Sequence, residues 1–231
     1  MAAQGQAAVV ALGAGDCEAW RSGLWHQPVN TLSSLAFVVA GVWVATRPAA
    51  DRADRVSGVV YAGAVVGNGI GSLLYHGPGW PGSAFVHDAA IPAAVLFIVA
   101  DDAALLRGWS LRRKLAAYAT ALGVAGLAVA VVPGVSGAVT TASAVAAAVA
   151  EGAVVRRGHK APTHVLLTLA LAGVAGLAGR TGSPLCHPYT PLQGHAAWHV
   201  LTAVALLQWD QVRRARRRLR RPARWGGPAS R

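Results

Sequence analysis

The chain has 231 residues, of which 54% are hydrophobic and only 13% are charged, and its mean hydropathy is +0.43. These values exclude an ordinary soluble domain, which needs far more charge to cover its surface. The net charge of +12 does not indicate nucleic-acid binding, because the basic residues cluster in loops and in the C-terminal tail, and no stacking platform or recognition fold accompanies them.

Long apolar runs, separated by short clusters of charge, predict an all-α bundle of seven transmembrane helices. The runs are residues 30–46, 56–75, 85–106, 115–132, 135–155, 163–179 and 195–208. We expect residues 1–29 to form an N-terminal segment, residues 30–211 the bundle and residues 212–231 a polybasic tail. Gly63, Gly67 and Gly71 recur at a spacing of four within the second run, which predicts a close contact with another helix.

The basic residues predict the orientation of the bundle. All but two of the 21 lysines and arginines follow the first, third, fifth or seventh run, and the exceptions are Arg21 and Arg180. Because cytoplasmic loops carry the excess of positive charge, we expect the N-terminus outside and the C-terminus in the cytoplasm. The arginine-rich tail is then expected to lie against anionic lipid headgroups.

Polar residues gather at the predicted outer ends of three helices. Ser72 and His76 lie one helical turn apart near the end of the second helix, and Asp88 lies near the start of the third. His195 and His199 lie on one face at the start of the seventh. Ionisable residues within membrane spans are functional candidates by default.

This set of residues has a concrete chemical interpretation. Two histidines at i and i+4 can chelate one metal ion, and His76 supplies a third nitrogen, which is the pattern of a catalytic zinc site with one position left for water. Zinc makes that water a nucleophile near neutral pH, Asp88 is expected to move its proton, and Ser72 to donate to an oxyanion. The alternatives are interfacial histidines and a Ser72 that bonds to its own helix.

We do not expect His87 at this site, because it precedes Asp88 directly and should face another side of the helix. The two cysteines, Cys17 and Cys186, both fall on the predicted outer side, where a disulfide can persist. Two free thiols are the alternative to such a bridge.

Five segments together resemble the alkaline ceramidases, a family of the wider group of seven-helix membrane hydrolases that includes the adiponectin-receptor-like proteins. They are DCE at residues 16–18, PVNTLSSLAF at 28–37, GIGSLLYH at 69–76, HD at 87–88 and GHAAWHVL at 194–201. These segments span nearly the whole chain in the order found in the family, so the resemblance does not depend on a single motif.

The resemblance implies zinc-dependent hydrolysis of the amide bond of ceramide, or of a related N-acyl lipid, to fatty acid and amine. It implies zinc ligands at His76, His195 and His199, catalytic roles for Ser72 and Asp88, and a disulfide between Cys17 and Cys186.

The resemblance also implies a calcium site that includes Asp16 and Glu18. However, Trp20 stands where the family has an asparagine, and Gln27 stands where it has a glutamate.

The abundance of alanine, glycine and arginine is typical of GC-rich bacteria, so we expect a multi-pass protein of a bacterial plasma membrane. The main alternative function is a metal-containing seven-helix receptor or transporter without hydrolase activity. Ser72 and Asp88 favour the enzyme, because a purely structural metal site needs neither.

Overall fold

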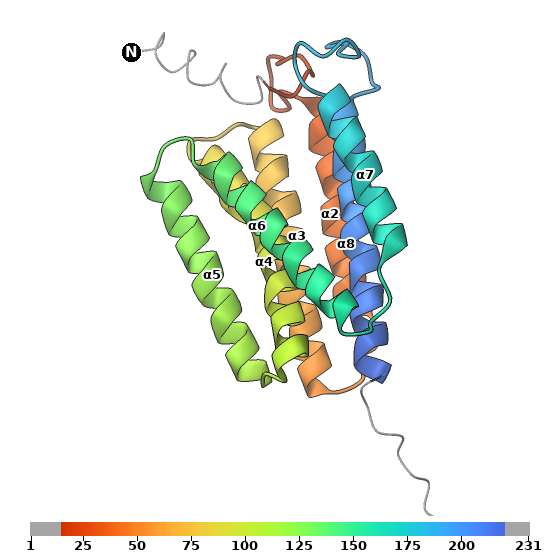
Figure 1. Ribbon diagram of the computed structural model, residues 1–231. Helices are drawn as coiled ribbons and strands as arrows, with labels where there is room; N and C mark the ends of the chain where they lie inside the picture. Colours follow the sequence, from red (N-terminus) through yellow and green to blue (C-terminus); the bar gives the residue numbers. More distant parts are fainter. Residues whose placement is uncertain (1–14, 220–231) are drawn as a thin grey trace, which may run out of the picture.

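The computed structural model describes residues 15–219, which fold into seven α-helices and no strands (Figure 1). The helices are α2 (Pro28–Thr46), α3 (Arg52–His76), α4 (Ser83–Arg107), α5 (Leu111–Val131), α6 (Ser136–Arg156), α7 (Thr163–Ala178) and α8 (Gly194–Leu219). The predicted all-helical bundle is therefore confirmed over the described residues.

Five of these helices, α2 to α6, are long and apolar enough to cross a membrane, which indicates a membrane protein. The other two differ from the prediction. Helix α7 has only 16 residues, and α8 has 26 and continues to Leu219, well beyond the expected end of its apolar run. The first eight residues of the predicted tail are therefore helical, whereas residues 220–231 lie outside the described part, as do residues 1–14 of the N-terminal segment. The orientation across the membrane stays a prediction.

The helices form a side-by-side arrangement in which α2 contacts α3 and α8, α4 contacts α3, α5 and α6, and α7 packs on α8. The core contains the aromatic side chains of Phe37, Tyr61, Phe97 and Trp209. Many large apolar side chains point outward instead, and on α7 they include Leu167, which is 67% exposed. This distribution suits a lipid environment, where apolar groups on the outer surface carry no hydrophobic cost.

Polar side chains concentrate at the two ends of the bundle. The histidine end carries His76, at the end of α3, together with His195 and His199, at the start of α8. The arginine end carries the ion pairs made by the last residues of α8, including Arg213.

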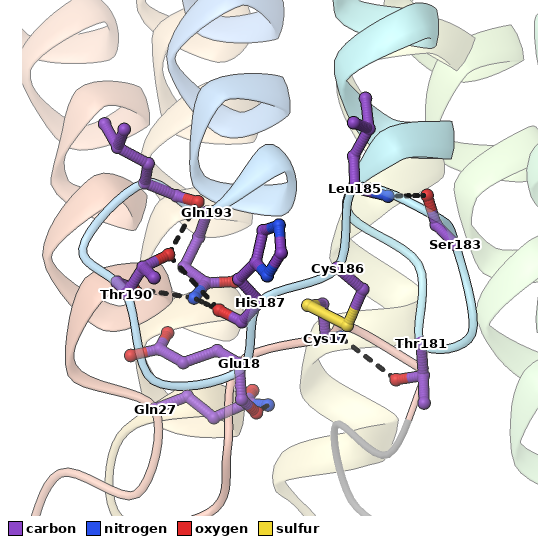
Figure 2. Close-up of a disulfide and its surroundings, with 11 residues drawn as sticks. Cys17, Glu18, Gln27, Thr181, Ser183, Leu185, Cys186, His187, Thr190 and Gln193 are labelled. Carbon is purple, nitrogen blue, oxygen red and sulfur yellow. Dashed lines mark hydrogen bonds between the residues drawn. A yellow bond between two sulfur atoms is a disulfide. The ribbon is translucent and has the colours of Figure 1, made fainter.

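A disulfide between Cys17 and Cys186 closes the histidine end, as predicted (Figure 2). It joins the segment before α2 to the loop between α7 and α8, and the amide of Cys17 donates to the hydroxyl of Thr181 in the same loop at 3.1 Å. Nearby, Gln193 donates to the carbonyl oxygens of His187 and Thr190. These contacts fix the loop that leads into His195.

Two glycines set the start of α8. A side chain at Gly179, where α7 ends, would collide with the backbone of Gly194 and His195. The last turn of α7 and the first turn of α8 therefore meet backbone to backbone. This close approach fixes the position of the backbone of His195 against the end of α7.

Candidate metal centre

Three histidines from two helices converge at the histidine end. His76 ends α3, and His195 and His199 lie one turn apart at the start of α8. One ring nitrogen of each lies within 4.8 Å of the others, and this is a group that could hold a metal ion. His76 and His199 are fully buried, and His195 is partly buried.

The hydrogen bonds of His76 determine which ring nitrogen carries its proton. Its Nδ1 lies 2.6 Å from Oε1 of Gln27, and the amide nitrogen of Gln27 donates to the carbonyl oxygen of Glu18 at 2.8 Å. Because the second contact fixes the amide orientation, Oε1 can only accept, so Nδ1 of His76 must donate. The lone pair of His76 is then on Nε2.

The same logic applies to His199. Its Nδ1 lies 2.8 Å from Oγ of Ser33. The only hydroxyl hydrogen of Ser33 is donated to the carbonyl oxygen of Asn30, at 2.9 Å. The hydroxyl therefore accepts from Nδ1 of His199, and Nε2 again carries the lone pair. Nδ1 of His195 faces a carboxylate, Oδ1 of Asp16, at 3.3 Å.

The three imidazoles are thus oriented as metal ligands usually are, with Nδ1 facing an oxygen and Nε2 turned toward the other histidines. The Nε2 atoms of His76 and His195 are buried and have no hydrogen-bond partner. A buried nitrogen without a partner is costly, and a metal ion would satisfy both atoms at once. The residues present therefore fit a metal ion bound by three neutral imidazoles, and the geometry does not identify which metal.

Ser72 lies directly beside this group. Its hydroxyl is 3.2 Å from Nε2 of His199 and 2.9 Å from the hydroxyl of Ser34, and its side chain is buried. Among the three histidines, His199 is the one whose Nε2 lies at hydrogen-bond distance from a serine hydroxyl. Ser72 therefore lies next to the position that a metal ion held by the three histidines would occupy.

Asp88 is not in this group of three, and its carboxylate pairs with the neighbouring His87. Its Oδ1 is 2.9 Å from Nδ1 of His87. The ring of His87 stacks on that of Tyr75, and its centroid is 5.9 Å from the centroid of His76. His87 is not in the group of three that could hold a metal ion, but its ring lies near that of His76 because α4 approaches α3 closely at Gly71, where an added Cβ would lie 3.1 Å from Cα of His87.

The two residues assigned to calcium from the resemblance make other contacts in the structure. Both carboxylate oxygens of Glu18 accept backbone amides at the start of α2, from Val29 and Asn30 at 2.9 and 2.8 Å. Asp16 faces His195, and burial raises the pKa of its carboxyl to about 6. Burial also raises the pKa of Glu18, although its two backbone hydrogen bonds oppose the shift. A calcium site at Asp16 and Glu18 stays a prediction.

The support that Gln27 gives to His76 leads to a testable expectation. We expect Gln27→Leu, which removes the acceptor for Nδ1 at similar volume, to weaken metal binding about 10- to 100-fold. The measurement is a titration of the purified protein against a competing chelator. Gln27→Glu is the matched control, because it keeps an acceptor oxygen and should retain most of the affinity. Equal affinities for the two variants would contradict the assigned role of Gln27.

Comparisons of this chain with family models, with curated proteins and with solved structures find no match. The interpretation of the site therefore depends on its own geometry.

Proposed function

We propose that this protein is a zinc-dependent intramembrane hydrolase that cleaves the amide bond of an N-acyl lipid of the ceramide class. The observation that carries the proposal is the convergence of three histidines, two of them fully buried and one partly buried, beside the hydroxyl of Ser72. A site that only stabilises the fold has no use for a serine at this position.

Zinc is the metal that best suits three neutral imidazoles with one position left open. When bound, it would supply Lewis acidity and a water that is nucleophilic near neutral pH. In the reaction, the water oxygen bonds to the carbonyl carbon, the carbon–nitrogen bond breaks, and the amine leaves with a proton, so that fatty acid and free amine are formed.

The protein side chains would stabilise the oxyanion, transfer the proton and orient the metal ligands. Ser72 would donate its hydroxyl proton to the oxygen that becomes negative as the carbonyl carbon turns tetrahedral. Asp88, hydrogen-bonded to His87 at 2.9 Å, would take up the proton from the attacking water and pass it to the leaving amine. Gln27, Ser33 and Asp16 would hold the three imidazoles in the orientation that the ligand geometry needs.

An apolar groove near this site supports a lipid substrate. It has a volume of about 540 Å³ and lies between α3, α4 and α5, and Gly63, Gly67 and Tyr118 are among the residues that line it. Its near end is formed by Phe85 and Val86, which directly precede His87. Nothing lies within 4 Å of where a side chain at Gly63 or Gly67 would begin, so these glycines leave room for an alkyl chain instead of the helix contact predicted for them.

The proposal includes the location of the reaction. With the N-terminus outside, the histidine end would lie at the outer surface of a bacterial plasma membrane, and the disulfide would face an oxidising compartment.

The test is metal analysis and lipid hydrolysis on one detergent-purified sample, with His195→Ala/His199→Ala as the variant. We expect close to one zinc per wild-type chain and release of fatty acid from ceramide or another N-acyl lipid. The variant should lose both, because one histidine alone does not hold zinc tightly. Zinc without hydrolysis across a broad panel of lipids would favour the metal-containing receptor or transporter instead. Absence of zinc from a folded sample would refute the site.

A further inference from the structure

A second cavity lies at the opposite end of the bundle from the histidines. Its volume is about 420 Å³, and it is formed by the first turn of α3, the turn between α4 and α5, and the last turns of α8. The proposed hydrolase uses no residue of this cavity. Its charged lining residues are Asp51, Asp54, Lys114, Arg214, Arg217 and Arg218.

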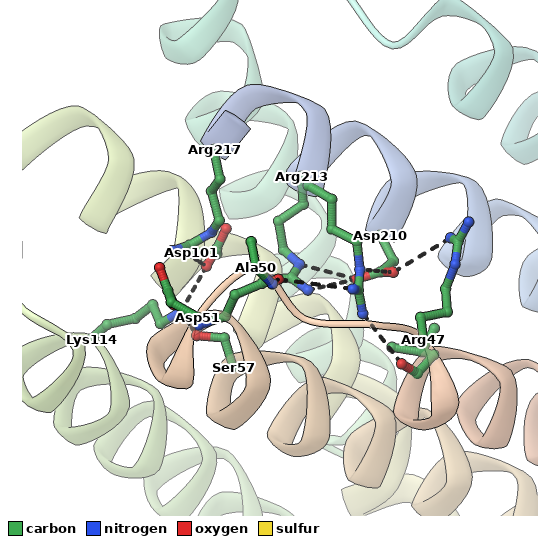
Figure 3. A network of polar contacts seen from close by, with 12 residues as sticks. Arg47, Ala50, Asp51, Ser57, Asp101, Lys114, Asp210, Arg213 and Arg217 are labelled. Atoms are coloured by element: carbon green, nitrogen blue, oxygen red, sulfur yellow. Dashed lines mark hydrogen bonds and ion pairs between the residues drawn. The ribbon is translucent and has the colours of Figure 1, made fainter. Parts of the chain in front are cut away.

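Two carboxylates of the arginine end, Asp101 and Asp210, are each shared between several cations (Figure 3). Asp101 pairs with both Lys114 and Arg217, at 2.8 Å to Nζ of Lys114. Asp210 pairs with Arg213 and Arg214, each at 2.7 Å, and Arg47 lies 3.8 Å from it. Because four cations and two carboxylates line the cavity, its wall carries a surplus of positive charge even though most of these cations are paired.

Two cations of the cavity, Arg217 and Arg218, have hydrogen-bond donors that no described residue accepts. Arg217 has a buried Nε with no hydrogen-bond partner, and Arg218 is exposed and makes no ion pair with any residue between 15 and 219. Both line the cavity. A guanidinium group binds the oxygens of a phosphate with two parallel hydrogen bonds, so these side chains suit a phosphate group better than a single halide-like ion.

The surroundings of the cavity point to the membrane surface. Leu105, Leu111 and Trp109 line it beside the charged groups, and the guanidinium of Arg113 lies over the Trp109 ring at 4.7 Å. Tryptophan next to basic residues at a helix end is typical of the level of lipid headgroups. An anionic ligand here would therefore have both an apolar part and a phosphate.

We propose that this cavity is a binding site for the phosphate-bearing headgroup of an anionic lipid. Arg217 and Arg218 would contact the phosphate, while Leu105 and Leu111 would contact the start of the acyl region. By joining α8 to the turn between α4 and α5, such a lipid would stabilise the arginine end. The site is independent of hydrolysis at the histidine end.

The test is native mass spectrometry of the full chain in neutral detergent, titrated with phosphatidylglycerol or with phosphatidylcholine. In detergent no charged bilayer surface contributes to binding. We expect selective retention of phosphatidylglycerol, and Arg218→Gln should weaken it about ten-fold, the loss expected for a hydrogen bond to a charged group. Arg112→Gln is the matched control, because Arg112 is exposed at the same end but does not line the cavity.

Three results would overturn the proposal. The first is equal weakening by the two substitutions, which would indicate general attraction to a basic surface. The second is equal retention of phosphatidylcholine. The third is displacement of phosphatidylglycerol by inorganic phosphate at the same concentration, which would indicate a site for free phosphate. Thermal unfolding of each variant without lipid checks that Arg218→Gln leaves the fold intact, as expected for an exposed side chain.

Discussion

Ser72→Ala should retain the metal and lose most of the hydrolysis. We expect kcat on an N-acyl lipid to fall by about 10²- to 10³-fold, which is the usual effect of removing one donor to an oxyanion. The physical reason is that Ser72 is buried and its hydroxyl lies 3.2 Å from Nε2 of His199, so it is beside the place where the three histidines would hold a metal ion but is not one of them. The measurement pairs steady-state kinetics with metal analysis on the same preparation.

Ser143→Ala is the control for this substitution. Ser143 is also a buried serine, but it lies on α6, which carries none of the three histidines. Its hydroxyl donates to the carbonyl oxygen of Val139 on the same helix. It should leave both metal content and hydrolysis unchanged. If Ser72→Ala instead lost its metal, Ser72 would be a support for His199. If hydrolysis continued at the wild-type rate with metal bound, the role of Ser72 in the proposed reaction would be wrong.

The helices and the histidine group could be predicted from the sequence because each depends on a local pattern. Apolar runs of membrane length predicted all seven helices, and the one-turn spacing of His195 and His199 predicted their common face. The residues that orient the imidazoles could not be predicted in the same way, because Gln27 and Ser33 reach the histidines only after α2 packs between α3 and α8. The one available signal was a run of polar residues at the start of an otherwise apolar helix.

The end of α8 was harder to predict for an electrostatic reason. Arg213 and Arg216 look like part of a solvated tail when hydropathy is averaged along the chain. In the structure both are buried, because carboxylates of other helices, Asp54 of α3 for Arg213 and Glu151 of α6 for Arg216, pair with them in addition to Asp210 of α8 itself. Hydropathy along the chain does not show that carboxylates of distant segments will neutralise these arginines. The predicted helix therefore ended at residue 208, whereas α8 continues to Leu219.

The ion pairs of Asp210 should therefore matter for stability more than surface ion pairs do. Asp210 is fully buried and accepts from Arg213, at 2.7 Å to Nη2, and from Nε of Arg214 at 2.7 Å. The remaining partner of Arg213 is Asp54, at 3.4 Å. We expect Asp210→Ala to lower the free energy of unfolding by about 3–5 kcal/mol, because it leaves a buried guanidinium without its main counter-charge.

The measurement is denaturant-induced unfolding in detergent, and two further variants determine how the result is interpreted. Gln211→Ala changes the neighbouring exposed residue of the same helix and should stay within about 0.5 kcal/mol of the wild type. Asp210→Leu/Arg213→Leu removes both charges and should recover much of the loss, because replacing a buried pair by apolar groups is often close to neutral. If the double variant were as unstable as Asp210→Ala, packing would be responsible. If Asp210→Ala unfolded like the wild type, the arginine end would be solvated and its ion pairs would not be buried.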